Sequence, residues 1–496
     1  MAKNLSSSNL LVVLLAALLV ASCGGGGGSS GTASSASSES ASSPASWSLP
    51  APAWSPPSVP ATNPGKICDQ FYSPSFVLKA GETNEPLSTL STLSKPNKAQ
   101  IFPEPVYGTC LGRVTDSNDI PVVGPATPAG EGLVNDYSMR QAFNADSTKL
   151  LVYAINGGNW YLYDATTFNF IENLPLSGGD NEPQWDPTDP NLLYWLPTNG
   201  GLVVNQLDVS TNQNTVIGDF TTRVPAIWPT AQHVWTRSKG SPSYNRQYWA
   251  FKVGDANFNL LGFMVWDKVH DQIVSTFTPT TAADQVDPDW IGMSPSGNFV
   301  LVAWDAGAGP GDTEVFTPDF KNRFSLYSAG AEHGDIALDV NGDDVYVSID
   351  YANTGDIYMR RLKDGVLVDL VPTYLDPSVS WTTALHISGK AFAKPGWALI
   401  STYGASSTNN EQQWIEKKVF ALQLTYNQNP TIYEITHTFQ VDSAVGADPS
   451  IGTYYTEPHA SVNWDFTKVV WSSNWNVDSG INLDDYMVQL PAGAVK

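Results

Sequence analysis

The sequence predicts an all-β fold built from repeated short strands. Its 496 residues include 40 Gly and 35 Pro, which favour turns, and 17 Trp, 20 Tyr and 19 Phe, which favour strands. From residue 98 onward, short alternating runs follow one another with turn residues between them, and no amphipathic helical stretch of useful length appears. Because 42% of the residues are hydrophobic and only 15% are charged, the chain can bury a large core.

The first 22 residues predict an export signal. Lys3 supplies a positive charge, and the apolar run from Leu10 to Ala21 is too short to span a bilayer as a helix. The run ends in Val20-Ala21-Ser22-Cys23, which resembles the processing site of bacterial lipoproteins. The resemblance implies that Cys23 carries acyl chains such as palmitate, and several chains on one residue give stable anchoring. Since residue 24 is Gly and not Asp, we expect a lipid-anchored protein of the outer membrane, facing the periplasm or the cell surface.

Residues 23–65 predict a tether, and residues 66–496 a folded domain. The tether is rich in Gly, Ser, Ala and Pro, and so lacks the apolar side chains that would offset the entropy of ordering it. Two further cysteines, Cys68 and Cys110, lie at the start of the domain. In an exported chain they favour one disulfide, and the alternative is a pair of buried thiols.

A longer repeat organises the domain. Phe143-Asn144-Ala145-Asp146-Ser147 leads into a set of short strands, and related units recur near Glu182–Pro187, Trp290–Val302 and His459–Trp471. A period of roughly 40 to 50 residues with four strands per unit is typical of the blades of a β-propeller. Seven inner strands are expected near Ser138, Gln184, Tyr248, Trp290, Asp335, His386 and Ser461. This count predicts a seven-bladed propeller, with six or eight blades as alternatives.

One strand, Val106–Val114, is left over before the first blade. The last blade contains about three strands and ends near residue 490, so it lacks an outer strand. Pairing the spare strand with this blade would close the ring and remove two open sheet edges. We therefore expect a propeller closed by an N-terminal strand.

Several turn motifs resemble those of TolB-like and WD40-like propellers of bacterial envelopes. They are Asn144-Ala145-Asp146, Ser294-Pro295-Ser296-Gly297 and Trp464-Asp465, and the resemblance extends from about residue 98 to the end. The resemblance implies the fold, and a fold of this kind does not by itself define a function.

The charge balance excludes one class of partner. The chain has 48 acidic and 25 basic side chains, and a formal net charge of -23. A surface this acidic repels phosphate backbones, so we expect no nucleic-acid partner.

Polar residues at the starts of the expected inner strands predict a ligand site at the mouth of the central channel. Three of the six histidines stand at equivalent positions in successive blades, at His333, His386 and His459. Three imidazoles with a carboxylate could hold a divalent transition metal, and the alternative is that each histidine caps its own blade. The other residues expected at the mouth are Arg140, Glu182, Asp287, Asp289, Asp335 and Glu457.

A second group of candidates lies in the third blade, at Arg237, Tyr244 and Arg246. Cationic side chains beside an aromatic ring can receive a carboxylate or sulfate group while the ring stacks on a sugar face. The alternative is an ordinary solvated hairpin.

Two functions follow from these features. In its architecture and its His, Tyr and Arg inventory the chain is similar to the oligogalacturonate and ulvan lyases. That similarity implies a metal-assisted polysaccharide lyase that acts on uronate polymers, with the three histidines on the metal and the third-blade residues near the sugar. The other hypothesis, which we favour slightly, is a non-catalytic platform that binds glycans or envelope proteins. A positive patch at one channel entrance would favour the enzyme, and its absence the platform.

Overall fold

The computed structural model describes thirteen parts of the chain. They are residues 68, 71–82, 93–116, 132–155, 158–304, 309, 313–327, 333–351, 354–373, 383–404, 414–440, 454–475 and 483–496. Cys23, the predicted signal peptide and the predicted tether lie outside these residues. Within them, no helix combines the length and the apolar character needed to cross a bilayer.

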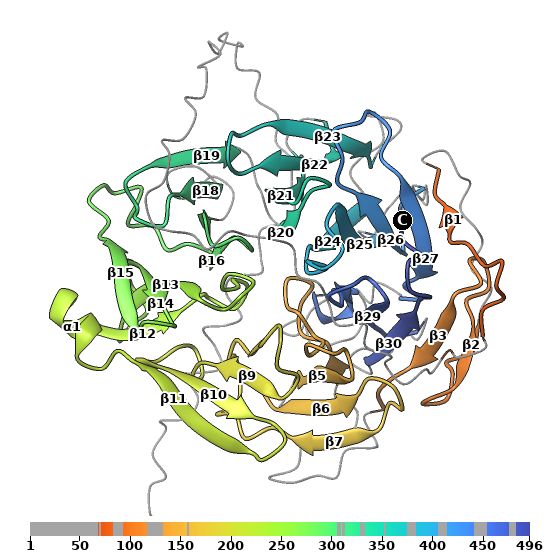
Figure 1. Cartoon of the computed structure of the whole chain (residues 1–496), viewed down its shortest axis with the longest axis horizontal. Coiled ribbons are helices and arrows are strands. Elements are labelled where there is room, and N and C mark those ends of the chain that lie inside the picture. Colours follow the sequence, from red (N-terminus) through yellow and green to blue (C-terminus); the bar gives the residue numbers. More distant parts are fainter. Residues whose placement is uncertain are drawn as a thin grey trace, which may run out of the picture.

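Seven antiparallel sheets surround a central axis in the described residues, which confirms the predicted seven-bladed propeller (Figure 1). Blade one contains β4 (Leu133–Val134), β5 (Lys149–Ala154), β6 (Trp160–Asp164) and β7 (Phe170–Asn173). Blade two contains β8 (Gln184–Trp185), β9 (Leu192–Trp195), β10 (Val203–Asp208) and β11 (Gln213–Asp219). Blade three follows the short helix α1 (Arg223–Ile227) and contains β12 (Ala231–Trp235), β13 (Tyr248–Asp255), β14 (Leu260–Asp267) and β15 (Gln272–Phe277).

The remaining blades repeat this arrangement. Blade four contains β16 (Trp290–Met293), β17 (Val300–Ala303), β18 (Thr313–Phe316) and β19 (Arg323–Tyr327). Blade five contains β20 (Asp335–Leu338), β21 (Asp344–Ile349), β22 (Asp356–Arg361) and β23 (Leu367–Pro372). Blade six contains β24 (Thr383–Ser388), β25 (Trp397–Gly404), β26 (Lys418–Gln423) and β27 (Ile432–His437). Blade seven contains β28 (Ser461–Val462), β29 (Lys468–Ser473) and β30 (Asp484–Gln489), after the 3-10 turn η1 (Tyr454–Thr456).

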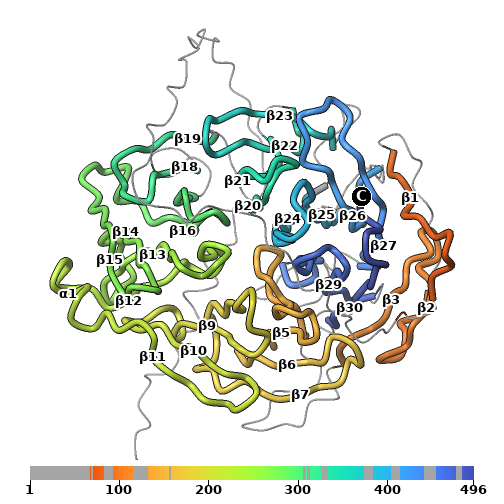
Figure 2. Tube along the Cα trace, in the orientation of Figure 1, coloured from red at the N-terminus to blue at the C-terminus, as the bar shows by residue number. Residues whose placement is uncertain are grey.

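Three N-terminal strands complete the last two blades. β3 (Cys110–Arg113) pairs with β30, with Cys110 opposite Gln489, and β2 (Ile101–Pro103) adds a fifth strand beyond it. β1 (Lys79–Ala80) extends blade six by pairing with β27. Figure 2 shows these strands in orange beside the blue C-terminal blades. The expected closure of the ring by an N-terminal strand is therefore confirmed.

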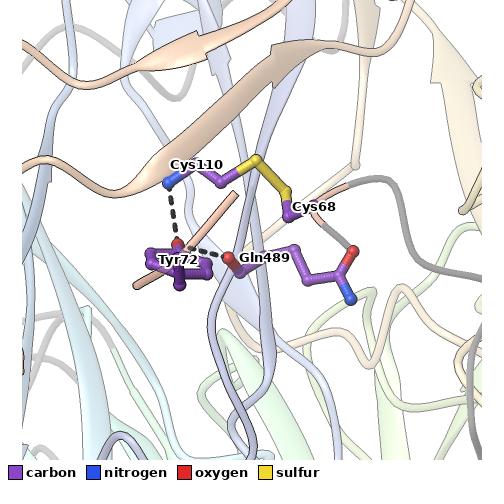
Figure 3. Close-up of a disulfide and its surroundings, with 4 residues drawn as sticks. All are labelled: Cys68, Tyr72, Cys110 and Gln489. Atoms are coloured by element: carbon purple, nitrogen blue, oxygen red, sulfur yellow. Dashed lines mark hydrogen bonds between the residues drawn. A yellow bond between two sulfur atoms is a disulfide. The ribbon is translucent and has the colours of Figure 1, made fainter. Parts of the chain in front are cut away.

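A disulfide fastens this closure. Cys68 and Cys110 are bonded, as the sequence favours, and Cys110 is the first residue of β3 (Figure 3). The hydroxyl of Tyr72 accepts a hydrogen bond from the Cys110 amide (2.7 Å) and donates one to the Gln489 carbonyl (2.6 Å). The segment that enters the domain is thus tied to both strands at the closure.

The inner strand of blade three differs from the expectation. It is β12, whereas Tyr248 begins the second strand, β13. The stretch between them packs on blade four, where Ile291 and Met293 donate backbone hydrogen bonds to Thr236 and Ser241. The close contact between the backbones of blades three and four needs a glycine at position 240, because a Cβ on Gly240 would lie 1.8 Å from the Ile291 carbonyl oxygen. In blade one, the expected position near Ser138 falls in a turn after β4.

Large buried side chains pack between neighbouring blades. Trp266 of blade three and Phe220 after blade two meet edge to face, with ring centroids 5.4 Å apart. Trp471 and Tyr486 of blade seven lie in the cluster that also contains Leu111 of the closing strand. Aromatic side chains contribute large buried areas to such cores. The sheets thereby hold the inner strands around the central axis of the ring (Figure 1).

Candidate metal centre

The three histidines converge near the starts of three inner strands. His386 lies within β24, His333 precedes β20, and His459 precedes β28, so that three successive blades contribute one imidazole each. The ring centroids of His333 and His386 are 4.9 Å apart, and those of His386 and His459 are 4.3 Å apart. The convergence expected from their equivalent positions is present in the fold.

Glu457 joins two of these histidines. Its Oε2 atom lies 2.6 Å from Nε2 of His386 and 3.4 Å from Nε2 of His459. The possible ligand atoms of His386, Glu457 and His459 all lie within 4.8 Å of one another. Glu457 supplies the carboxylate of this ligand set, and His333, the third expected histidine, lies outside it.

The protonation states of this cluster suit a metal ion. Burial, with the neighbouring charge of His459, lowers the pKa of His386 to about 3, so its imidazole is neutral near neutral pH. Burial opposes ionisation of Glu457, but hydrogen bonds from His386 and His459 outweigh burial and lower its pKa to about 2. Metal ligands must be neutral imidazoles and ionised carboxylates, and His386 and Glu457 meet these conditions.

A buried nitrogen atom of His386 supports the same interpretation. Nδ1 of His386 makes no hydrogen bond to any described residue, although the side chain is 0% exposed. A buried polar atom without a partner is costly, and such an atom in a native structure calls for an explanation such as an absent ion. Two imidazoles and one carboxylate form a donor set that Zn²⁺, Mn²⁺ or another divalent transition metal can use.

His333 stands beside this group without belonging to it. Its Nδ1 atom lies 3.5 Å from the hydroxyl oxygen of Tyr137, and its backbone has a φ of 63°. Burial is the main cause that lowers the pKa of His333 to about 4. The imidazole is therefore neutral near neutral pH and able to accept a proton.

Aromatic rings that the sequence analysis did not select surround the histidines. The ring of Tyr137 lies 5.3 Å from His386 and 5.0 Å from His459, while Tyr403 stacks on His386 at 5.4 Å. Tyr454 is 4.7 Å from His459. Tyr137 stands three positions before Arg140, and Tyr454 three positions before Glu457. This shared spacing is a signal in the sequence that could have identified both tyrosines.

The basic residues at the mouth are paired with acids. Lys239 contacts Asp289 at 2.6 Å and lies 5.7 Å from the ring centroid of Tyr137. Arg237 lies 3.8 Å from Asp287 and 3.9 Å from Asp289, and it donates a hydrogen bond to the Pro288 carbonyl. A further cation, Arg140, pairs with Asp136. These groups do not form an unbalanced positive patch.

Other residues expected at the mouth have structural partners. Both carboxylate oxygens of Glu182 accept a hydrogen bond from the Thr236 amide, and burial with the charge of Asp180 raises the pKa of Glu182 to about 7. Asp335 binds the ammonium group of Lys390 at 2.9 Å and the amide of Gly389 at 2.7 Å. These carboxylates join neighbouring inner strands.

Tyr244 and Arg246 do not join the histidines. Arg246 is buried and donates to the carbonyls of Trp185, Ser243 and Tyr244. The ring of Tyr244 meets that of Trp464, which follows β28, whereas His459 precedes β28. The two residues therefore lie beyond the opposite end of the inner strands, and the expectation that they reach a sugar beside the metal is corrected.

We expect acid to destabilise the metal-free domain through its buried histidines. The folded-state pKa values of His333 and His386, about 4 and about 3, lie below the ordinary value of 6.5. Their stabilising contribution is complete above that value and is lost as the pH falls towards the folded values. The free energy of unfolding should fall by up to about 1.4 kcal/mol per pH unit for each histidine, as measured by urea unfolding after chelator treatment.

A matched pair of variants tests this assignment. His386→Gln should flatten the pH dependence, whereas His233→Gln, in blade three, should leave it as steep as in the unmodified protein. A profile that His386→Gln does not change would contradict the assignment.

The fold resembles that of solved propellers, although no family model and no curated protein matches the sequence. An oligogalacturonate lyase in complex with manganese aligns with a TM-score of 0.54 and 14% identity, over 80% of this chain and 97% of that chain. An oligogalacturonate lyase from Vibrio parahaemolyticus gives a TM-score of 0.52 and 13% identity, over 79% and 96%. TolB from Acinetobacter baumannii gives 0.32 and 14%, over 62% and 64%. The chain thus shares its propeller fold with the oligogalacturonate lyases.

Proposed function

We propose that this protein is a metal-assisted lyase of uronate-containing polysaccharides. The observation that carries the proposal is the convergence of His386, Glu457 and His459, with the neutral imidazole of His333 beside them. Two solved structures of the same fold are oligogalacturonate lyases, and one of them is in complex with manganese. These likenesses support the proposal at the level of the fold.

His386, Glu457 and His459 would hold the divalent ion. When bound, the ion would supply positive charge that offsets the uronate carboxylate and so lowers the pKa of the neighbouring C5 proton. His333 would accept that proton, and its neutral, half-buried imidazole beside the cluster supports this role. The hydrogen bond with Tyr137 fixes the orientation of its ring.

The proposed reaction is a β-elimination. His333 takes the C5 proton, and the electron pair of the C–H bond forms a double bond between C4 and C5. The bond between C4 and the glycosidic oxygen breaks, and the leaving oxygen takes up a proton. The products are an unsaturated uronate end and a new hydroxyl end, and the base returns to its neutral form when it releases its proton.

A second candidate is a platform that binds glycans or envelope proteins without cleaving them. The pairing of Lys239 and Arg237 with Asp289 favours it, since a polyanion would meet few unpaired cations at the mouth. In either role, we propose that Cys23 is lipidated and that the domain is held in the cell envelope; the sequence motif supports this.

We expect His333→Asn to lower the rate of uronate cleavage by about 10²- to 10⁴-fold, the usual contribution of a general base. Asparagine tolerates the positive φ at this position, so the fold should persist. The Mn²⁺-loaded full chain would be assayed on polygalacturonate, alginate and ulvan by the ultraviolet absorbance of the unsaturated product, with Mn²⁺ affinity measured alongside.

Three results separate the candidates. Cleavage that His333→Asn abolishes, with Mn²⁺ affinity unchanged, supports the lyase. Binding of Mn²⁺ and polymer without an unsaturated product indicates the platform. A chain that binds no Mn²⁺ overturns the metal-assisted proposal.

A further inference from the structure

The backbone at His459 has an unusual conformation. Its φ is 41°, in the left-handed region that a residue with a side chain rarely adopts. A residue stays in such a conformation when the surrounding contacts hold it there. The contacts that hold this backbone conformation therefore help to set the orientation of the His459 imidazole towards Glu457.

Hydrogen bonds from three blades hold the segment that carries His459. The side-chain amide of Asn135, after β4, donates to the His459 carbonyl at 2.9 Å. Ser472 of blade seven donates its backbone N–H to the Pro458 carbonyl at 3.1 Å, and Ser401 of blade six accepts from the Ala460 amide at 3.1 Å. Of these contacts, the one from Asn135 is made to His459 itself.

Asn135 is in turn fixed by the ring closure. Its backbone amide donates to a carboxylate oxygen of Asp485, in β30, at 3.0 Å. The amide of Asp485 donates to the hydroxyl of Thr115 at 2.8 Å, and the amide of Val114 donates to the Asp485 carbonyl at 2.8 Å. Thr115 and Val114 directly follow β3, the closing strand. Asn135, Asp485 and Thr115 are at most 1% exposed, so water competes little for these bonds.

We infer that Asn135 is a positioning residue for the metal centre and that it links His459 to the closing N-terminal strand. The inference rests on the proposed function in taking His459 as a metal ligand. The side-chain amide of Asn135 holds the backbone turn that directs the imidazole of His459 towards Glu457. Outer-shell partners that orient the side chains of metal ligands typically change metal affinity by about 10- to 100-fold when they are replaced, and we expect an effect of this size from Asn135, which acts through the backbone of His459.

The test compares two asparagines in the full chain. Asn135→Ala should weaken Mn²⁺ binding by about 10- to 100-fold in calorimetric titration. Asn463→Ala is the control, because Asn463 is also a buried asparagine whose side chain bonds Ser147 and Thr467, but it follows β28 at the end away from His459. The control should lower stability and leave Mn²⁺ affinity unchanged. Equal affinity losses in both variants, or no loss in Asn135→Ala, would overturn the inference.

A second measurement separates this inference from the proposed function. The imidazole nitrogen NMR signals of His459 can be recorded in the metal-free protein. We expect them to shift in Asn135→Ala and to stay in place in Asn463→Ala. If the unmodified chain binds no Mn²⁺ but this difference appears, the positioning role stands and the proposed function fails. Unchanged signals in Asn135→Ala would overturn the positioning role.

Discussion

Exchange of Glu457 for glutamine should weaken Mn²⁺ binding more than about 100-fold, beyond the range expected for a supporting residue. Glu457 is the carboxylate of the cluster, and one of its oxygens faces Nε2 of both His386 and His459. Glutamine keeps the shape of the side chain and can still accept a hydrogen bond, but it removes the negative charge that offsets the charge of the ion. Calorimetric titration with Mn²⁺ after chelator treatment measures the change.

Glu434→Gln is the appropriate control for this variant. Glu434 is a fully buried carboxylate of blade six, 3.1 Å from the ammonium group of Lys418. Removing one partner of a buried ion pair is strongly destabilising, so this control should lower stability at least as much as Glu457→Gln. It should nevertheless bind Mn²⁺ as the unmodified protein does. Retained affinity in Glu457→Gln, or equal losses in both variants, would contradict the assignment of the ligand.

Most of the fold follows from features that are local in the sequence. The repeating units, the turn motifs and the spare strand Val106–Val114 together predict seven blades and their closure, because an unpaired sheet edge is unfavourable. Blade three is the exception. Its innermost backbone packs on blade four through a stretch that includes Gly240, and that contact joins residues about 50 positions apart.

The different position of the inner strand in blade three also explains why Tyr244 and Arg246 do not lie beside the histidines. When the inner strand of blade three is placed at Tyr248, the preceding Tyr244 and Arg246 fall at the channel mouth. In the structure the inner strand is β12, so these residues lie in the turn beyond its other end. A shift of one strand in an antiparallel sheet moves a residue to the opposite end of the blade.

The histidines were predictable because their positions in successive blades are equivalent. The pairing of Glu457 with His386 was not, because it joins side chains of different blades that are 71 positions apart in the sequence. Tyr403, which stacks on His386, lies in a second strand, β25, where the position of a residue in the repeat does not mark it as a neighbour of the histidines. Contacts between side chains of different strands and blades leave no clear pattern in a single sequence.

Replacing both Cys68 and Cys110 by serine should lower the free energy of unfolding by about 4 kcal/mol, the loop-entropy estimate for a bridge across 42 residues. The bridge restricts the unfolded chain, and in the native state it ties the entry of the domain to the first residue of the closing strand. Urea unfolding of the unmodified and doubly substituted chains, monitored by tryptophan fluorescence, measures the difference.

Two comparisons show whether the loss belongs to the bridge. The unmodified chain in reductant should unfold like the double variant, and reductant should not change the double variant further. The hydrogen bonds of Tyr72 to Cys110 and Gln489 do not require the bridge, so the ring should stay closed and the double variant should still bind Mn²⁺. A double variant as stable as the unmodified chain would mean that the pairing of β3 with β30 suffices to close the ring. Loss of Mn²⁺ binding would instead mean that the bridge keeps the closing strand in register. The hydrogen bonds that link this strand through Asp485 and Asn135 to His459 would then depend on the bridge.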